Sequence, residues 1–164
     1  MEKKSFAQMD CSVAQCLEVV GEWWSLLIIR DAFLGFNRFE QFQRRLGISR
    51  NILQSRLESL VDSGVLRREP YSDHPPRFEY RLTDKGRDLW SVLTAMRQWG
   101  DRHASPSGPR IELVHKGCGA TTDVEYVCKS CGERVTARDV VAVDGPGRPN
   151  HGDPHRVAAA SRHH

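Results

Sequence analysis

Two sets of side chains in this sequence have the types and the spacing to do chemistry. The first set is polar and lies around the start of an amphipathic segment at 49–62: Ser49, Arg50, Asn51, Gln54 and Ser55. Arginine can form two hydrogen bonds with guanine, and asparagine or glutamine can do the same with adenine. We therefore expect Arg50 to contact guanine, and Asn51 or Gln54 to contact adenine. Ordinary exposure to solvent is the competing explanation for the two amides.

Arginine dominates the charge around this set. Residues 38–81 contain nine Arg, no Lys and six acidic residues, so the local formal charge is +3. Phosphate contacts are expected from the other eight arginines: Arg38, Arg44, Arg45, Arg56, Arg67, Arg68, Arg77 and Arg81. A general preference for Arg over Lys along the chain explains the choice of residue equally well. For Arg56, an exposed ion pair with a nearby acid is as good an explanation as a phosphate contact.

The second set consists of His115-x-x-Cys118 and Cys128-x-x-Cys131, each followed by glycine. Ligands at positions i and i+3 of a tight turn can occupy two corners of a tetrahedron. Two such turns would bind one zinc ion through three thiolates and an imidazole. Nine residues separate the two pairs, which is fewer than usual for this kind of site. The pattern predicts one structural zinc ion and no organic cofactor, and the alternative is a ribbon that folds without metal.

The polar set at 49–55 is positioned by two predicted helices around a glycine corner. Gly47 and Ile48 form the corner, and Ser49 is the expected cap of the second helix. Asn37 is the expected cap of the first helix. Apolar residues at helical spacing predict the buried faces of the pair: Phe39, Phe42, Leu46, Leu53, Leu57, Leu60 and Val61.

Two more helices are expected before this pair. Ser12 and Gln15 have the spacing of a capping box, which predicts the start of a helix that Gly21 ends. Residues 23–33 are apolar over most of a helical circumference, so we expect this segment to lie in the core rather than on the surface.

A hairpin and a long helix are expected after the pair. The runs 65–68 and 78–82 predict two short strands joined by a Pro-rich loop, and Thr83 is the expected cap of a helix to about residue 103. An apolar stripe of this helix lies outside the compact helical core and predicts a dimer interface: Leu89, Val92, Leu93, Met96 and Trp99. The alternative is that the stripe packs on the first two helices of the same chain.

These elements predict an α+β fold: a mainly helical winged helix-turn-helix with a β-hairpin wing, plus a small C-terminal β-rich, zinc-ribbon-like module. We expect the winged helix at 1–104, a linker at 105–110, the module at 111–143 and a disordered tail at 144–164. A helix-turn-helix places the N-terminal residues of its second helix against base edges. The expected partner is therefore double-stranded DNA.

Over half of the chain also resembles the HxlR family of bacterial winged helix-turn-helix regulators, relatives of the MarR type. The matching segments are Cys11-Ser-Val, GEWWSLLIIRDAF at 21–33, RFEQF at 38–42, GISRNILQSRLESLVDSGVLRRE at 47–69, PPRFEYRLTDKG at 75–86 and QWG at 98–100. The resemblance implies a homodimer joined through terminal helices. Its two recognition helices would then lie roughly 34 Å apart on a pseudo-palindromic operator.

The resemblance also places Cys11 at the position of an N-terminal cysteine that senses electrophiles or oxidants in some relatives. Such a switch requires a lowered thiol pKa, and the alternative role for Cys11 is that of a small buried hydrophobe. We expect Cys16 to be structural. The five cysteines of this chain are not expected to form a disulfide framework.

The composition narrows the possible functions. No apolar run is long enough to span a bilayer and the N-terminus lacks the apolar region of a signal peptide, so we expect a cytoplasmic protein without a membrane partner. The sequence shows no catalytic triad, no paired carboxylates and no phosphate-binding glycine loop. We therefore expect that the protein is not an enzyme. The prediction is a sequence-specific transcriptional repressor that responds to a small-molecule or thiol-reactive inducer. The alternative is a protein-interaction module of the transcription machinery.

Overall fold

The computed structural model describes residues 5–143 and 145–147 and divides the chain into two compact units, Met1–Arg110 and Ile111–His164. The tail predicted from residue 144 lies outside the described residues, apart from 145–147. In the described part of the chain, no single helix is long and apolar enough to cross a membrane. The first two helices meet that criterion only when taken together, and the chain bends by 78° between them.

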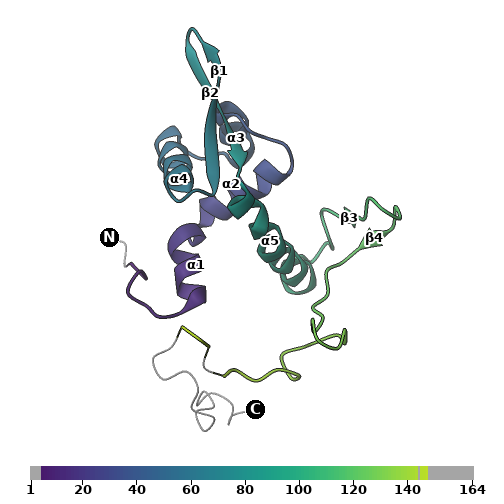
Figure 1. Ribbon diagram of the computed structural model, residues 1–164. Helices are drawn as coiled ribbons and strands as arrows, with labels where there is room; N and C mark the ends of the chain where they lie inside the picture. The colour runs from purple at the N-terminus through teal and green to yellow at the C-terminus, as the bar shows by residue number, and fades with distance from the viewer. Residues whose placement is uncertain (1–4, 144, 148–164) are drawn as a thin grey trace. The chain divides into compact units, whose positions relative to one another are not determined.

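The first unit is a winged helix-turn-helix, as predicted (Figure 1). It comprises helices α1 (Ser12–Val20), α2 (Trp23–Phe33), α3 (Phe39–Leu46), α4 (Arg50–Asp62) and α5 (Asp84–His103), with strands β1 (Leu66–Asp73) and β2 (Pro76–Leu82) between α4 and α5. Figure 1 shows the hairpin projecting beside α3 and α4, whereas α1 and α5 extend from the opposite end of the unit.

Local signals set the ends of the helix-turn-helix. Gly47 follows α3 with a φ of 65°, a left-handed conformation that glycine adopts without steric cost. The Ser49 side chain then caps α4 by accepting a hydrogen bond from the backbone N–H of Ile52 at 3.4 Å. Thr83 caps α5 in the same way, accepting from the N–H of Gly86 at 3.1 Å. These predictions are confirmed.

Two predicted caps are wrong. Cys11, not Ser12, occupies the N-cap of α1, and Ser12 is already the first helical residue. The Gln15 amide donates to backbone carbonyls of the preceding segment, including that of Met9 at 2.8 Å. Arg38 rather than Asn37 is the N-cap of α3, and the Asn37 amide donates to Glu79 of the hairpin at 3.1 Å.

The core of the first unit combines one face of α4 with α2, α3 and the start of the hairpin. The predicted stripe of α4 is confirmed, since Leu53, Leu57 and Leu60 have no exposed surface. The other buried members of the cluster are Val20, Ile28, Ile29, Phe42, Ile48, Val65 and Leu66. α2 is not wholly internal, because Trp23 at its first position is 85% exposed.

The wing is longer than its apolar runs suggest. The antiparallel ladder extends from Leu66↔Leu82 to Asp73↔Pro76, with an irregularity between Pro70 and Ser72. Much of the predicted loop is therefore strand. Because backbone hydrogen bonds can extend a ladder through polar residues, side-chain hydropathy underestimates its length.

The second unit has little regular structure. Its strands β3 (Leu113–Val114) and β4 (Thr121–Thr122) are two residues each and pair antiparallel. An isolated bridge joins Val127 and Arg134. None of residues 111–143 is buried. A β-rich module was predicted here, but the described residues show only this sparse pairing, and a zinc-ribbon arrangement is not apparent among them.

Candidate nucleic-acid interface

The first half of α4 presents the predicted polar set to solvent. Ser49, Arg50, Asn51, Gln54 and Ser55 are all exposed. The apolar stripe of the same helix is buried, which fixes the rotation of α4 about its axis. The five polar residues of this set therefore lie on the exposed surface of α4.

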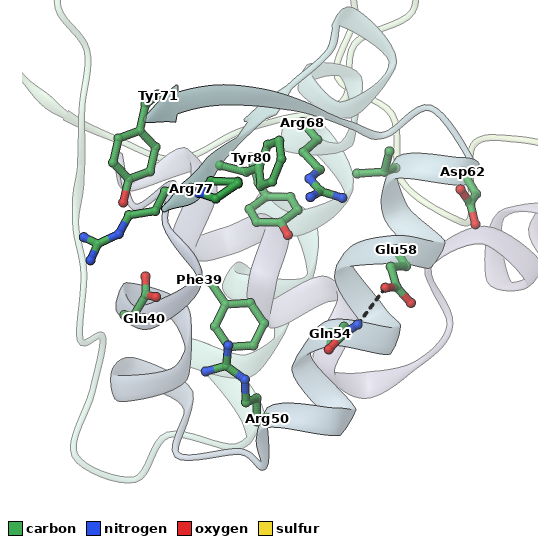
Figure 2. A pocket seen from close by; sticks show the side chains of 13 residues that line it. Phe39, Glu40, Arg50, Gln54, Glu58, Asp62, Arg68, Tyr71, Arg77 and Tyr80 are labelled. Carbon is green, nitrogen blue, oxygen red and sulfur yellow. Dashed lines mark hydrogen bonds between the residues drawn. The ribbon is translucent and has the colours of Figure 1, made fainter. Parts of the chain in front are cut away.

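A groove of about 370 Å³ runs between this surface and the wing (Figure 2). On the α4 side, the Arg50 guanidinium lies over the Phe39 ring at 4.8 Å, and Gln54 donates to Glu58 at 3.0 Å. On the wing side, the Arg68 guanidinium lies 3.4 Å from the centre of the Phe78 ring. The groove thus has arginines on both sides.

Aromatic residues of this groove were not predicted as part of the site. Phe39, Tyr71, Phe78 and Tyr80 line it together with the arginines. Burial raises the pKa of the Tyr80 hydroxyl, so this group is neutral over the physiological range. Phe39 was expected only as a core residue of α3, and its spacing within the helix gives no sign that α4 places a guanidinium over the ring.

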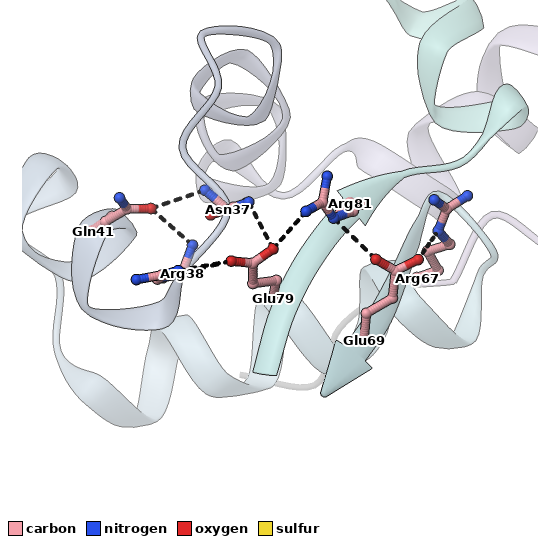
Figure 3. Close-up of polar contacts among 7 residues, drawn as sticks. All are labelled: Asn37, Arg38, Gln41, Arg67, Glu69, Glu79 and Arg81. Atoms are coloured by element: carbon pink, nitrogen blue, oxygen red, sulfur yellow. Dashed lines mark hydrogen bonds and ion pairs between the residues drawn. The ribbon is translucent and has the colours of Figure 1, made fainter. Parts of the chain in front are cut away.

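Several predicted phosphate-binding arginines instead pair with carboxylates on the wing (Figure 3). Glu79 accepts from Arg38 at 3.0 Å and from Arg81 at 2.7 Å. Glu69 on the neighbouring strand accepts from Arg81 at 2.9 Å and from Arg67 at 2.6 Å. The hydrogen bonds from Arg38 are the largest influence on the Glu79 carboxyl and, together with Arg81, hold its pKa below the ordinary value although burial opposes this. This network ties the start of α3 to the wing.

Two further arginines are held within the helical body. Asp31 is fully buried and accepts from Arg45 at 2.9 Å and from Arg30 at 2.8 Å. This places a charged link between α2 and α3. Arg56 pairs with Glu22 at 3.0 Å, which agrees with the ion-pair explanation for that residue.

The remaining predicted contact residues are unpaired. Within residues 5–143, the side chains of Arg44, Arg77, Asn51 and Ser55 have no hydrogen-bond or ion-pair partner, and Arg68 contacts only an aromatic ring. Sequence alone did not separate these residues from the ion-paired arginines. The separation follows from which carboxylates the fold brings within reach.

The predicted dimer stripe divides into two parts. Leu89 and Leu93 pack against the core of their own chain. Val92, Met96 and Trp99 face outward, with Met96 50% and Trp99 60% exposed. α5 therefore has an exposed apolar surface beyond its contact with the core. Val13 and Leu17, one turn apart on α1, are exposed as well.

The two N-terminal cysteines differ in environment. Cys11 is a free, exposed thiol at the N-cap of α1. It lies at the rim of a shallow hollow formed by residues 7–12 and Gln15. Cys16 is partly buried and packs against the hydrophobic core, in agreement with a structural role.

The predicted zinc ligands form two pairs. His115 Nδ1 and Cys118 Sγ lie 3.3 Å apart. Backbone hydrogen bonds from Cys131 and Ser130 lower the pKa of the Cys128 thiol. Among the described residues, however, no three His, Cys, Asp or Glu side chains come together as a ligand set.

Comparison with known proteins agrees with this architecture. The model of the HxlR-like helix-turn-helix family matches residues 19–108, which include every element from α2 to α5. An HTH-type transcriptional regulator of Mycobacterium tuberculosis strain H37Rv, Rv3095, which is described as uncharacterized, is 50% identical over 137 residues. The match covers 83% of this chain and 87% of the relative.

Two solved structures have a similar fold. The crystal structure of PA1607, described as a candidate transcription factor, matches with a TM-score of 0.77 at 39% identity and covers 87% of this chain and 100% of that one. A redox regulator named HypR, in its oxidized form, matches with a TM-score of 0.53 at 33% identity. That match covers 57% of this chain and 97% of HypR.

Proposed function

Since this chain belongs to the HxlR-like helix-turn-helix family and is a transcriptional regulator with a DNA-binding fold, we propose that it is a homodimeric repressor of a pseudo-palindromic operator. The observation that carries the proposal is the exposed polar surface of α4, with Arg50, Asn51 and Gln54 on the half of the helix that meets base edges in this fold. The protein-interaction alternative is not favoured, because it gives this surface no role.

We divide the arginines into two groups according to whether each has a carboxylate partner. Arg44, Arg68 and Arg77 have no carboxylate partner among the described residues, so they can contact phosphate without breaking an ion pair. Arg38, Arg45, Arg67 and Arg81 would first have to give up at least part of an existing pair. We therefore assign the first group to phosphate contacts and the second group to holding the wing and α3 in position.

The outward faces of α5 and α1 support the proposed dimer. Val92, Met96 and Trp99 occupy one side of α5 at i, i+4 and i+7, and a second copy of the chain would cover this apolar surface. A twofold axis there would produce two copies of α4, as a pseudo-palindromic operator requires.

Selection of bound sequences from random DNA, followed by binding titrations, tests the base-reading role. Arg50→Ala and Gln54→Ala should each weaken binding to the selected operator by roughly 1–3 kcal/mol, with a much smaller effect on random DNA. Arg87→Ala is the charge-matched control for Arg50→Ala, since Arg87 is an exposed arginine on α5. Equal losses on operator and random DNA would reject base reading by these two residues.

For the inducer, we propose that a thiol-reactive compound acts at Cys11. The exposed thiol at the start of α1 and the similarity to the redox regulator HypR support this proposal. Quinone treatment should release the wild-type protein from its operator but not the Cys11→Ser variant, as followed by fluorescence anisotropy. Cys16→Ser is the control for a second thiol nearby. Release of the Cys11→Ser variant at the wild-type quinone concentration would remove Cys11 as the sensor.

A further inference from the structure

The two Cys/His turns of the second unit have the same backbone design. In the first turn, the N–H of Gly119 donates to the carbonyl of His115 at 2.8 Å; in the second, the N–H of Gly132 donates to the carbonyl of Cys128, also at 2.8 Å. Both glycines are left-handed, with φ values of 72° and 76°. Each turn therefore closes over five residues and ends in a conformation that favours glycine.

The resemblance extends one residue beyond each turn. The N–H of His115 donates to the carbonyl of Ala120 at 2.9 Å, and the N–H of Cys128 donates to that of Glu133 at 2.8 Å. Both bonds run from the first residue of a turn to the residue after its closing glycine. The two segments thus adopt one hydrogen-bonding pattern, and they share metal-binding residue types at i and i+3 as well as the closing glycine.

Each turn brings its two side chains within the reach of a single ion. Two ligands of a tetrahedral zinc, one nitrogen and one sulfur, are roughly 3.6 Å apart for ordinary bond lengths. The 3.3 Å between His115 Nδ1 and Cys118 Sγ is close to this separation. In the second turn, the same backbone hydrogen bonds place Cys128 and Cys131 at the positions that His115 and Cys118 occupy in the first.

Space for the imidazole depends on the glycine inside the first turn. A Cβ atom at Gly117 would lie 2.9 Å from Cε1 of His115. A side chain at this position would force the ring to shift. Gly117 therefore leaves the room that the imidazole occupies beside Cys118.

The described residues 111–143 lack the features that usually stabilise a small domain. None of residues 111–143 is buried, so these residues form no hydrophobic core, and all three cysteines of the unit are free thiols. A segment without a hydrophobic core generally needs a disulfide, a metal or a partner to fold. A metal bound by both turns would provide the missing long-range connection.

We propose that His115, Cys118, Cys128 and Cys131 bind one structural zinc ion and that binding draws the two turns together. Each half-site is shaped by its own turn, whereas the four-ligand set requires both turns to meet at one ion, so metal binding and folding of this unit are coupled. Three thiolates and one imidazole suit zinc, and four protein ligands leave no open coordination position.

Metal analysis of the full-length protein, purified without chelator, tests the proposal. We expect about one zinc per chain by elemental analysis. After replacement by cobalt, we expect the visible ligand-field bands and the near-ultraviolet thiolate charge-transfer band of a tetrahedral, sulfur-rich site. A zinc-free protein that also fails to take up added zinc or cobalt would overturn the proposal, as would a Cys128–Cys131 disulfide in protein kept under reducing conditions.

Variants identify the ligands. Cys118→Ser, Cys131→Ser and His115→Ala should each lose most of the bound metal, whereas Cys11→Ser, Cys16→Ser and His103→Ala should keep it. His115→Cys should retain the ion and strengthen the thiolate band. Circular dichroism of the helices of the first unit verifies that each variant is folded. Unchanged zinc content in the double variant Cys118→Ser, Cys131→Ser would exclude this site. The operator titrations test DNA binding independently of the zinc content.

Discussion

Whether an arginine of this protein is available to a ligand depends on the carboxylate nearest to it. Arg67 and Arg68 are adjacent in sequence, but Arg67 pairs with Glu69 and Arg68 lies over the Phe78 ring. Arg44 and Arg45 differ in the same way, because only Arg45 reaches buried Asp31. Side chains of neighbouring residues point in different directions, so adjacent arginines meet different surroundings.

Glu79 is the residue on which the wing network converges, and its ionisation should influence stability. Its pKa in the folded protein lies below the ordinary value of 4.5, so the ionised form favours the folded state. This stabilisation of the folded state is fully present at pH values above 4.5 and is lost as the pH falls through the folded-state pKa of Glu79. Glu79→Gln should therefore be less stable than the wild type at pH 7 and should lose less stability on acidification.

Urea denaturation of both proteins between neutral and acidic pH measures this difference. Glu40→Gln is a suitable control, since Glu40 is exposed on α3 and outside the network. Parallel stability curves for wild type and Glu79→Gln would show that the Glu79 ion pairs do not contribute.

At the scale of elements, α2 and α3 are joined by a buried charge as well as by apolar packing. Asp31 has no exposed surface, while its partners Arg30 and Arg45 remain partly exposed. Burial of a carboxylate is tolerated only when hydrogen bonds replace its lost hydration. The two arginines supply these hydrogen bonds, so this pairing helps to fix the approach of α3 to α2 and thereby the position of α4.

Asp31→Ala should destabilise the protein by about 3 kcal/mol, because it removes the shared partner of two guanidinium groups and leaves a cavity. Arg30→Ala should cost much less, since Arg45 would still donate to the carboxylate and the Arg30 side chain is already partly exposed. Guanidinium chloride titrations measure both values. An Asp31→Ala protein as stable as the wild type would mean that packing alone positions α3.

At the scale of the whole molecule, the proposed dimer depends on the outward face of α5. Met96→Glu together with Trp99→Glu places two charges on this face and should convert a dimer to a monomer, with a large loss of operator affinity because only one recognition helix would bind at a time. Sedimentation equilibrium measures the association state. Val141→Glu is the control, since Val141 is also an exposed apolar residue but lies in the second unit.

A dimeric double variant would exclude this face as the interface. A wild-type protein that is monomeric at micromolar concentration would contradict the dimer itself. Neither result would affect the assignment of Arg50 and Gln54, because base reading by a single α4 is measured separately.

The amino-acid sequence by itself determined the order of elements and most of their ends. Gly47 acts through its left-handed backbone, and the caps formed by Ser49 and Thr83 bind N–H groups three positions away, so these effects can be predicted locally. The apolar spacing of α4 likewise determined which face is buried, and hence which polar residues are free. The family resemblance rests on these same segments.

Tertiary structure alone decided which arginines are available, how far the wing extends and which aromatic rings line the groove. The contact between Arg38 and Glu79 joins residues 41 positions apart. The Arg50–Phe39 stack depends on the angle between two helices. Such contacts are set by packing between elements. Residue type and spacing do not specify the partner, because a guanidinium can bind a carboxylate, an aromatic ring or a phosphate.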